Sequence, residues 1–214
     1  FYVSMSKAVN WWLQNRTNEK GLSFYSYRHE CGWLSEVTFG CDTPSATPDL
    51  AAYMVLAAEA LSKIADMLGK KDDSASWSAI SQTQLENIKS LWDGQHFNCI
   101  NVMTGESGIY KGLLSFIPLI LGKRLPDSII GTLSKSAKST DWEKTDIIPA
   151  SLVIMGLKNS GMINEAKTAA AQLVRSCISG GANDLRGNGI SSGAFFFPAS
   201  CSALLYLAYN TLLQ

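Results

Sequence analysis

A helical hairpin between residues 47 and 94 is the feature that most constrains the fold of this chain. Thr47-Pro48-Asp49 provides an N-cap residue, a first-turn proline and an acid near the positive end of the helix dipole. Apolar side chains then recur every three or four positions as far as Gly69: Leu50, Met54, Ala57, Leu61, Ile64 and Leu68. A second amphipathic helix, capped by Asp73 or Ser74, ends before Gly94. Because only a few polar residues join the two helices, they must run antiparallel.

Further helices follow the same periodicity and leave little room for strands. A second hairpin is expected from Pro149 to Cys177, broken at Gly161, and a final apolar helix over 199–213. Weaker patterns predict helices over 3–15, 110–122 and 127–138. Only 97–103 alternates like a strand. These patterns predict an all-α chain of seven or eight helices with minor β structure in its loops, forming a single domain over 1–214.

The charge balance and the residue content exclude several classes of partner. Eighteen Lys and Arg residues balance eighteen Asp and Glu residues, whereas a nucleic-acid-binding chain would carry a basic excess. The longest apolar run, 112–122, contains Ser115 and Pro118 and is too short to cross a bilayer. Five scattered cysteines and two histidines form no metal-ligand cluster, so neither a metal nor a cofactor is expected. Cys31 and Cys41 flank one loop and can pair in an oxidising compartment, which the sequence leaves open.

Four long loops, 17–47, 93–109, 138–147 and 178–197, are the candidate functional segments. Three of them combine aromatic and charged residues: Tyr25, Tyr27, Arg28, Glu30, Trp33 and Glu36 in the first, Trp142, Glu143 and Asp146 in the third, and Asp184, Arg186 and Phe195 to Phe197 in the last. Aromatic faces beside hydrogen-bonding side chains suit a sugar, which offers C–H faces and hydroxyl groups. For any single aromatic residue, packing in the core is the favoured alternative.

Two blocks of sequence carry a resemblance to a known family. The first runs from Tyr27 to Trp33 (Tyr-Arg-His-Glu-Cys-Gly-Trp), and the second opens with Thr47-Pro48-Asp49-Leu50 and continues as an alanine- and leucine-rich helix to Leu68-Gly69-Lys70. Together they resemble the six-hairpin (α/α)6-toroid glycoside hydrolases, namely the family 63 processing α-glucosidases and the trehalase-like and mannosylglycerate-hydrolase-like enzymes. The similarity extends along nearly the whole chain, although outside these two blocks it consists of generic helical sequence.

The resemblance implies a fold and a reaction. The fold is a ring of helical hairpins in two concentric layers, with the active site in loops at one end. Two carboxylic acids, roughly 6.5–9.5 Å apart, hydrolyse the glycosidic bond with inversion. Seven or eight helices are too few for the complete ring, so the chain is expected to be the C-terminal part of such a domain. A missing N-terminal segment or a partner chain would then cover the exposed apolar helix flanks, in keeping with a sequence that begins within a helix at Phe1.

The chain departs from the family at three functional loops. The general acid follows Gly-Trp in the family, and that position is Leu34 here, which has no proton to donate. The expected position of the base falls near Ser179-Gly180-Gly181, where no acid occurs, and the loop at Trp142 lacks the family's arginine. Displaced acids would have to act instead. Glu36 and Asp184 are the candidate catalytic pair, with Glu30 as the alternative acid and Glu143 or Asp146 as the alternative base.

Two hypotheses about function follow from these departures. The first is inverting hydrolysis of α-linked glucosyl or mannosyl saccharides, with Arg28, Glu30, Trp33, Trp142 and Phe197 binding the saccharide. The second is a catalytically inactive relative that binds carbohydrate or serves a structural or regulatory role. Asp49 is interpreted as a helix-start residue in both cases. A third interpretation is that a residue was misread at position 34 or within 178–190, because leucine and aspartate have similar shapes. Peptide mass spectrometry over residues 28–50 tests it at position 34.

Overall fold

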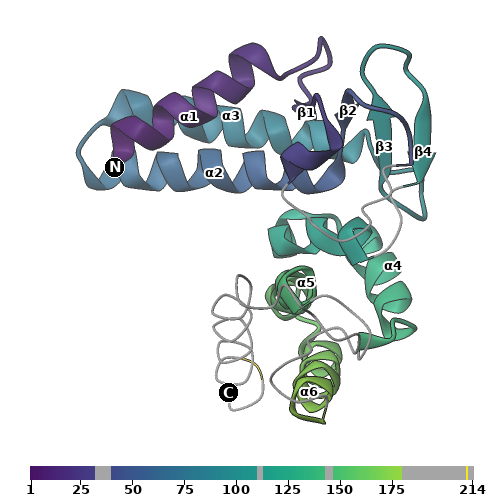
Figure 1. The fold of residues 1–214 in the computed structure, drawn as a ribbon. Helices are drawn as coiled ribbons and strands as arrows, with labels where there is room; N and C mark the ends of the chain where they lie inside the picture. Colours follow the sequence, from purple (N-terminus) through teal and green to yellow (C-terminus); the bar gives the residue numbers. More distant parts are fainter. Residues whose placement is uncertain (32–39, 110–112, 143–146, 180–210, 212–214) are drawn as a thin grey trace. The chain divides into compact units, whose positions relative to one another are not determined.

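In the computed structural model, residues 1–31, 40–109, 113–142, 147–179 and 211 are described (Figure 1). They fall into two units, Phe1–Ser115 and Phe116–Gln214, each of which is described by itself. The expectation of a single domain over 1–214 therefore stays a prediction.

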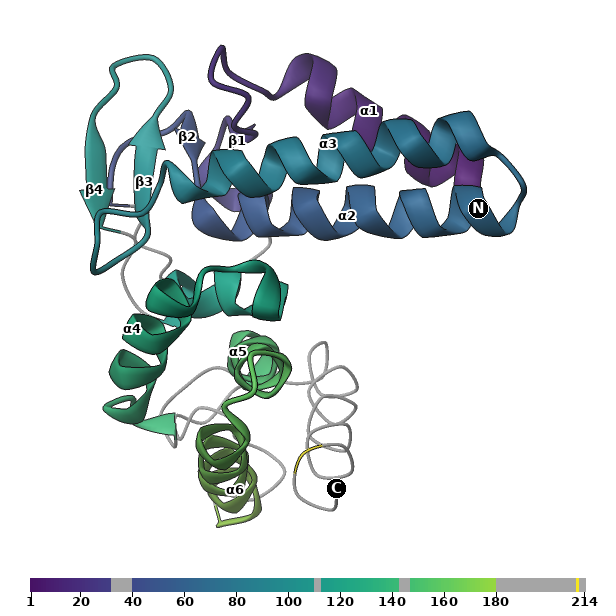
Figure 2. The same ribbon diagram turned by 180° about the vertical axis from the view of Figure 1, so that it is seen from behind.

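The first unit is organised by the expected helical hairpin. Helix α2 (Pro48–Met67) runs antiparallel to α3 (Lys71–Lys89), and α1 (Tyr2–Asn15) lies alongside them (Figures 1 and 2). The turn after α2 is a Schellman motif: Lys70 N–H donates to the Ala65 carbonyl at 2.9 Å and Gly69 N–H to the Asp66 carbonyl at 3.0 Å. Gly69 has a φ of 73°, which a residue without Cβ adopts freely.

The start of α3 differs from the expectation. Asp73 or Ser74 is the expected cap of this helix, but the helix begins at Lys71, so both residues lie inside its first turn. The Schellman motif explains the difference, because it returns the chain into helical conformation within a few residues of Gly69. The acids at 72 and 73 still favour this helix end through the helix dipole.

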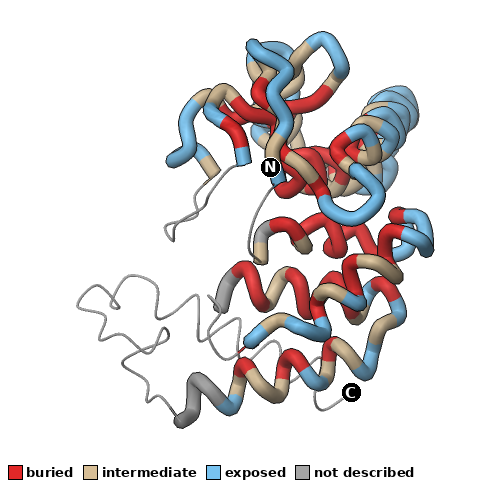
Figure 3. Tube along the Cα trace, turned by 90° about the vertical axis from the view of Figure 1, so that its right-hand side faces the viewer, coloured by how far each residue is buried: buried red, intermediate tan, exposed pale blue. Residues whose placement is uncertain are grey.

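Small side chains allow α2 and α3 to pack closely. The buried face of α2 contains four alanines together with Leu50, Met54, Val55 and Leu61, and Ile88 of α3 is fully buried. In Figure 3 the helices alternate between buried and exposed stretches, the pattern of amphipathic helices with one face in a core. The core of the first unit is completed by Leu22, Leu91 and Phe97.

A small antiparallel sheet lies at the end of the hairpin where α2 begins and α3 ends (Figures 1 and 2). Its order is β1 (Phe24–Tyr25), β2 (Ser45–Ala46), β3 (Asn98–Asn101) and β4 (Ser107–Ile109). The register pairs Tyr25 with Ser45, Ser45 with Asn101, and Cys99 with Gly108. The strand expected within 97–103 is confirmed as β3, whereas β1 and β2 have two residues each and are too short to show a period in the sequence.

The second unit contains three α-helices among its described residues: α4 (Asp127–Lys138), α5 (Ile147–Asn159) and α6 (Ile163–Ser179). The segment before α4, η2 (Leu113–Arg124), is a 3-10 helix. The helix expected over 110–122 is therefore present in its described part, but it is not an α-helix. Pro118 removes a backbone donor, and Gly122, with a φ of 58°, breaks the helix. The backbone of η2 packs directly on α5 at Gly156, where a Cβ would meet the backbone of Leu119 and Ile120.

The described elements confirm the expected fold class, which is all-α with αα-hairpins and minor β structure in the loops. Six α-helices occur in the described ranges, fewer than a complete ring of six hairpins requires. The helix expected over 199–213 lies outside the described residues. No described helix is long and apolar enough to cross a membrane.

Candidate functional site

The candidate site centres on the chain segment 32–39, which carries the Gly-Trp motif and lies outside the described residues. Both of its flanks belong to the first unit and are described. The N-terminal flank is the 3-10 turn η1 (Arg28–Cys31). The C-terminal flank begins at Gly40 and leads into β2. The contacts of these two flanks fix the two points between which the motif segment runs.

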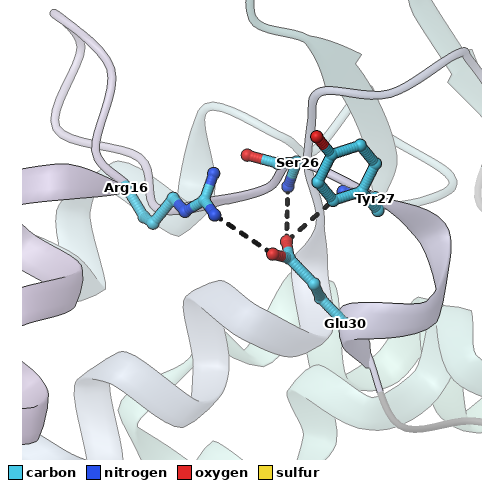
Figure 4. A network of polar contacts seen from close by, with 4 residues as sticks. All are labelled: Arg16, Ser26, Tyr27 and Glu30. Carbon is cyan, nitrogen blue, oxygen red and sulfur yellow. Dashed lines mark hydrogen bonds and ion pairs between the residues drawn. The ribbon is translucent and has the colours of Figure 1, made fainter.

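The N-terminal flank is held by the Glu30 carboxylate (Figure 4). Its Oε1 accepts from Arg16 Nη2 at 3.1 Å, and its Oε2 accepts from the backbone N–H groups of Ser26 at 2.6 Å and Tyr27 at 3.3 Å. The Arg16 guanidinium also lies 5.5 Å from the centre of the Trp11 ring, a cation–π contact. Three donors therefore converge on one carboxylate, which fixes the turn relative to the end of α1.

The C-terminal flank is held by a close approach of two glycines and by a buried polar group. Gly40 and Gly108 touch through their backbones, so a Cβ on either one would overlap the other segment. Cys41 Sγ lies 3.2 Å from Ser45 Oγ, and the same hydroxyl hydrogen-bonds the Cys99 thiol. Burial raises the pKa of both thiols, so both stay protonated at neutral pH.

A side-chain amide also ties this flank to the sheet. Asn101 Nδ2 donates to the Asp42 carbonyl at 2.9 Å, and Val102 N–H donates to the Pro44 carbonyl at 2.9 Å. Because Asn101 ends β3 and Val102 follows it directly, the chain leaving segment 32–39 is anchored beside the sheet within a few residues of Gly40.

A buried carboxylate lies beneath the start of α2. Asp49 is fully buried in the first helical turn and accepts a hydrogen bond from Tyr25 Oη at 3.3 Å. Burial raises the pKa of Tyr25, and the negative charge of Asp49 raises it further. The same two causes, in the same order, raise the pKa of Tyr53, one helical turn after Asp49. Both phenols therefore stay protonated, and Tyr25 acts as a donor that links β1 to α2.

Asp49 is more than the helix-start residue that the sequence suggests. It stands in the first turn as expected, but its carboxylate also bridges α2 to β1, and Cys31 is close enough to both tyrosines to affect their pKa values. Because Asp49 is fully buried, a substrate cannot reach its carboxylate in this structure. Its contribution is to hold together the strand that leads into η1 and the helix that follows β2.

The predicted site residues are distributed unevenly over the described structure. Arg28 and Glu30 lie in η1 and are brought together on an exposed turn, whereas Trp142 is buried in the second unit, 4% exposed. Four of them, Trp33, Glu36, Asp184 and Phe197, lie outside the described residues. The substrate-binding and catalytic roles of all seven stay predictions.

The sequence analysis did not identify the Tyr25–Asp49 contact or the group formed by Cys41, Ser45 and Cys99. The sequence contains a partial signal for the Tyr25–Asp49 contact. Asp49 follows Thr47-Pro48 in the first helical turn, and Tyr53 lies one turn later on the same face of the helix. The thiols at 31, 41 and 99 are free, so the possible pairing of Cys31 with Cys41 is not formed. Among the described residues, no group of three or more His, Cys, Asp or Glu side chains is arranged to hold a metal ion.

A comparison with protein families matches this region. The family model described as the mannosylglycerate hydrolase MGH1-like glycoside hydrolase domain matches residues 25–152, more than half of the chain. The match begins at β1, includes both flanks of segment 32–39, the α2–α3 hairpin and α4, and ends within α5. A search among curated proteins gives no match. The expected resemblance to six-hairpin glycosidases is confirmed, and the chain belongs to the family of mannosylglycerate hydrolase MGH1-like glycoside hydrolase domains.

Proposed function

We propose that this glycoside hydrolase-like domain hydrolyses α-linked glucosyl or mannosyl saccharides with inversion, with Glu36 as the general acid and Asp184 as the general base. The observation that carries the proposal is the family match over residues 25–152, which includes the motif segment and the framework around it. Saccharide is the substrate class that a glycoside hydrolase domain implies.

In an inverting reaction the two carboxyl groups have different tasks. The acid protonates the glycosidic oxygen, while the base removes a proton from a water molecule that attacks the anomeric carbon from the opposite face of the sugar. Neither step needs a cofactor. Both need placement, since a displacement of about 1 Å can reduce the rate about a hundredfold. The hydrogen bonds that hold both flanks of segment 32–39 support the proposal, because they fix the two points between which the motif segment runs.

The proposed saccharide contacts divide into aromatic and polar ones. Trp33 and Phe197 are the proposed aromatic contacts with sugar C–H groups at the catalytic site, whereas the buried Trp142 lines a pocket of the second unit. Arg28, which is exposed on η1, offers guanidinium donors to sugar hydroxyls. Glu30 already accepts from Arg16, Ser26 and Tyr27, so it holds the turn that carries Arg28 and reaches a saccharide only through its remaining lone pairs.

A second candidate function, saccharide binding without hydrolysis, is favoured by two specific observations. Leu34 occupies the position of the family's acid, and the nearest described acid, Glu30, is committed to the turn. A domain with this arrangement keeps the aromatic and polar loops of a sugar site while lacking a proton donor at the usual place.

We also propose that the chain forms the C-terminal part of an (α/α)6 domain and that a further helical segment or a partner chain packs against α1. Val3 and Trp11 of α1 expose 61% and 48% of their surface. Apolar side chains gathered on one helix in this way are typical of a face that another segment covers.

Hydrolysis assays on trehalose and on α-glucosides and α-mannosides test the proposal. Turnover that disappears in Glu36→Gln and in Asp184→Asn, and persists in Glu19→Gln, supports the assigned pair, since Glu19 is an exposed acid of the same unit. Anomeric NMR signals of the first-formed product report inversion. Binding without turnover in the native chain, with turnover created by Leu34→Asp, supports the second candidate instead. Absence of both binding and turnover would refute both.

A further inference from the structure

The second unit contains a pocket of about 340 Å³ between the end of α4, α5 and α6. Trp142 and the side chains of a leucine and two alanines form its apolar part. The polar part consists of Lys138 at the end of α4 and four residues of α6: Asn164, Glu165, Thr168 and Gln172. The volume falls at the small end of the range of about 300–1,000 Å³ that small-molecule sites occupy.

The polar residues of α6 form a regular row. Asn164, Thr168 and Gln172 recur every four positions, which places them on one face of the helix. Thr168 Oγ1 donates to the Asn164 carbonyl at 2.9 Å, so its oxygen is left to accept. The two side-chain amides offer both donors and acceptors. This row therefore presents alternating donors and acceptors along one side of the pocket.

The charges in the lining cancel each other. Lys138 Nζ lies 3.0 Å from Glu165 Oε1, and the hydrogen bond and charge of Lys138 lower the pKa of Glu165, so the pair is ionised at neutral pH. An anionic ligand would have to displace Glu165 from Lys138, and a cationic ligand would have to displace Lys138 from Glu165. A neutral ligand can hydrogen-bond to the remaining donors of the ammonium group and the free lone pairs of the carboxylate without separating them.

Trp142 supplies a fixed wall. Its side chain is held in the core of the unit, and it lines the pocket together with Leu157 of α5. Only the small exposed part of Trp142, 4% of its surface, reaches the pocket, so the indole and Leu157 form an apolar floor beside the more exposed amides and hydroxyl of α6. Apolar contact next to hydrogen-bonding groups suits a ligand with C–H groups and hydroxyls.

We infer that the Trp142 pocket of the second unit is a binding site for a neutral monosaccharide or disaccharide, held by the α6 row and the Lys138–Glu165 pair. Among its described lining residues Glu165 is the only carboxylate, and the ion pair occupies it, so the site binds the sugar without cleaving it. This inference does not require that the domain hydrolyses saccharides.

The test is calorimetric titration of the full chain with trehalose and with methyl α-mannoside, combined with NMR of the side-chain amides. We expect millimolar binding with shifted side-chain amide signals of Asn164 and Gln172, and a loss of about fivefold to tenfold in affinity in Gln172→Ala, the usual effect of a lost hydrogen bond. Gln82→Ala, a helical glutamine exposed on α3, is the matched control and should leave affinity unchanged. Both substitutions affect residues outside the core, and circular dichroism verifies folding.

Three results would contradict saccharide binding in this pocket. Absence of heat and of amide shifts up to about 50 mM sugar overturns the inference, because that concentration corresponds to a binding free energy weaker than about 2 kcal/mol. An unchanged affinity in Gln172→Ala overturns it as well, as does tighter binding of glucuronate than of the neutral sugars. Glu36→Gln separates this site from the proposed catalytic one, since it should abolish turnover and leave the amide shifts intact.

Discussion

Removing a single hydroxyl from Tyr25 tests whether the Asp49 carboxylate links β1 to α2. The Tyr25→Phe substitution keeps the ring and its edge contact with Trp12, whose centre lies 6.0 Å away. It deletes only the donor that reaches Asp49 Oδ2 at 3.3 Å. Because Asp49 is fully buried, water cannot readily replace this donor.

The expected loss follows from this geometry. Hydrogen bonds to charged groups contribute about 1.5–3 kcal/mol, and the O···O distance is longer than the usual value of about 2.8 Å for O–H···O bonds. We therefore expect Tyr25→Phe to lower the free energy of unfolding by about 1.5–2 kcal/mol. Urea denaturation followed by circular dichroism measures this as a lower midpoint with an unchanged slope.

Tyr53→Phe is the matched control. Tyr53 is also close to Asp49 on α2, but no hydrogen bond joins their side chains in the described structure, so its loss should be below about 0.5 kcal/mol. Combining Tyr25→Phe with Asp49→Asn completes a double-mutant cycle, for which we expect a coupling energy of about 1 kcal/mol or more. Equal losses in the two phenylalanine variants, or additive effects in the cycle, would refute the assigned link.

Three further outcomes are expected. Gly108→Ala should destabilise the chain by more than about 2 kcal/mol, because its Cβ would overlap the facing backbone, whereas Gly131→Ala in open space on α4 should stabilise it by about 0.5–1 kcal/mol; thermal unfolding separates the two. Lys138→Ala should return the pKa of Glu165 toward its ordinary value. A carboxylate whose pKa is lowered in the folded state stabilises the fold above its unfolded-state pKa, and this stabilisation is lost as the pH falls through its folded-state pKa. The variant should therefore be slightly less stable than the native chain at pH 7 and equally stable at acidic pH. Urea midpoints at the two pH values measure this difference. Cys99 should resist iodoacetamide at pH 8 until urea unfolds the chain, because it is buried and its pKa is raised; peptide mass spectrometry reads its modification.

The helices were predictable from sequence where local signals agreed. Thr47-Pro48 and Gly69 bracket α2 because capping and termination depend on residues within one turn of each end. The segment over 110–122 was expected to be α-helical because its apolar content is high, but Pro118 and Gly122 impose a 3-10 conformation with a break. Apolar content alone does not distinguish the two.

The candidate site was less predictable because its contacts are non-local. Tyr25 and Asp49 are separated by 24 positions, and Glu30 reaches Arg16 across 14. No periodic pattern reports such pairs, and strands of two residues carry too little sequence to reveal the pairing that brings them together. The motif around Trp33 located the region, whereas the bonds that anchor its flanks emerge only from the fold.

The glycine contact between Gly40 and Gly108 and the bonds of Glu30 have a consequence for how this domain can change over time. All of the flanking bonds described here are made by residues outside 32–39. Exchanging side chains at positions 33, 34 and 36 therefore removes none of the donors and acceptors of these bonds. The hydrogen-bonding groups that hold the two flanks are therefore the same whether an acid or a leucine occupies position 34.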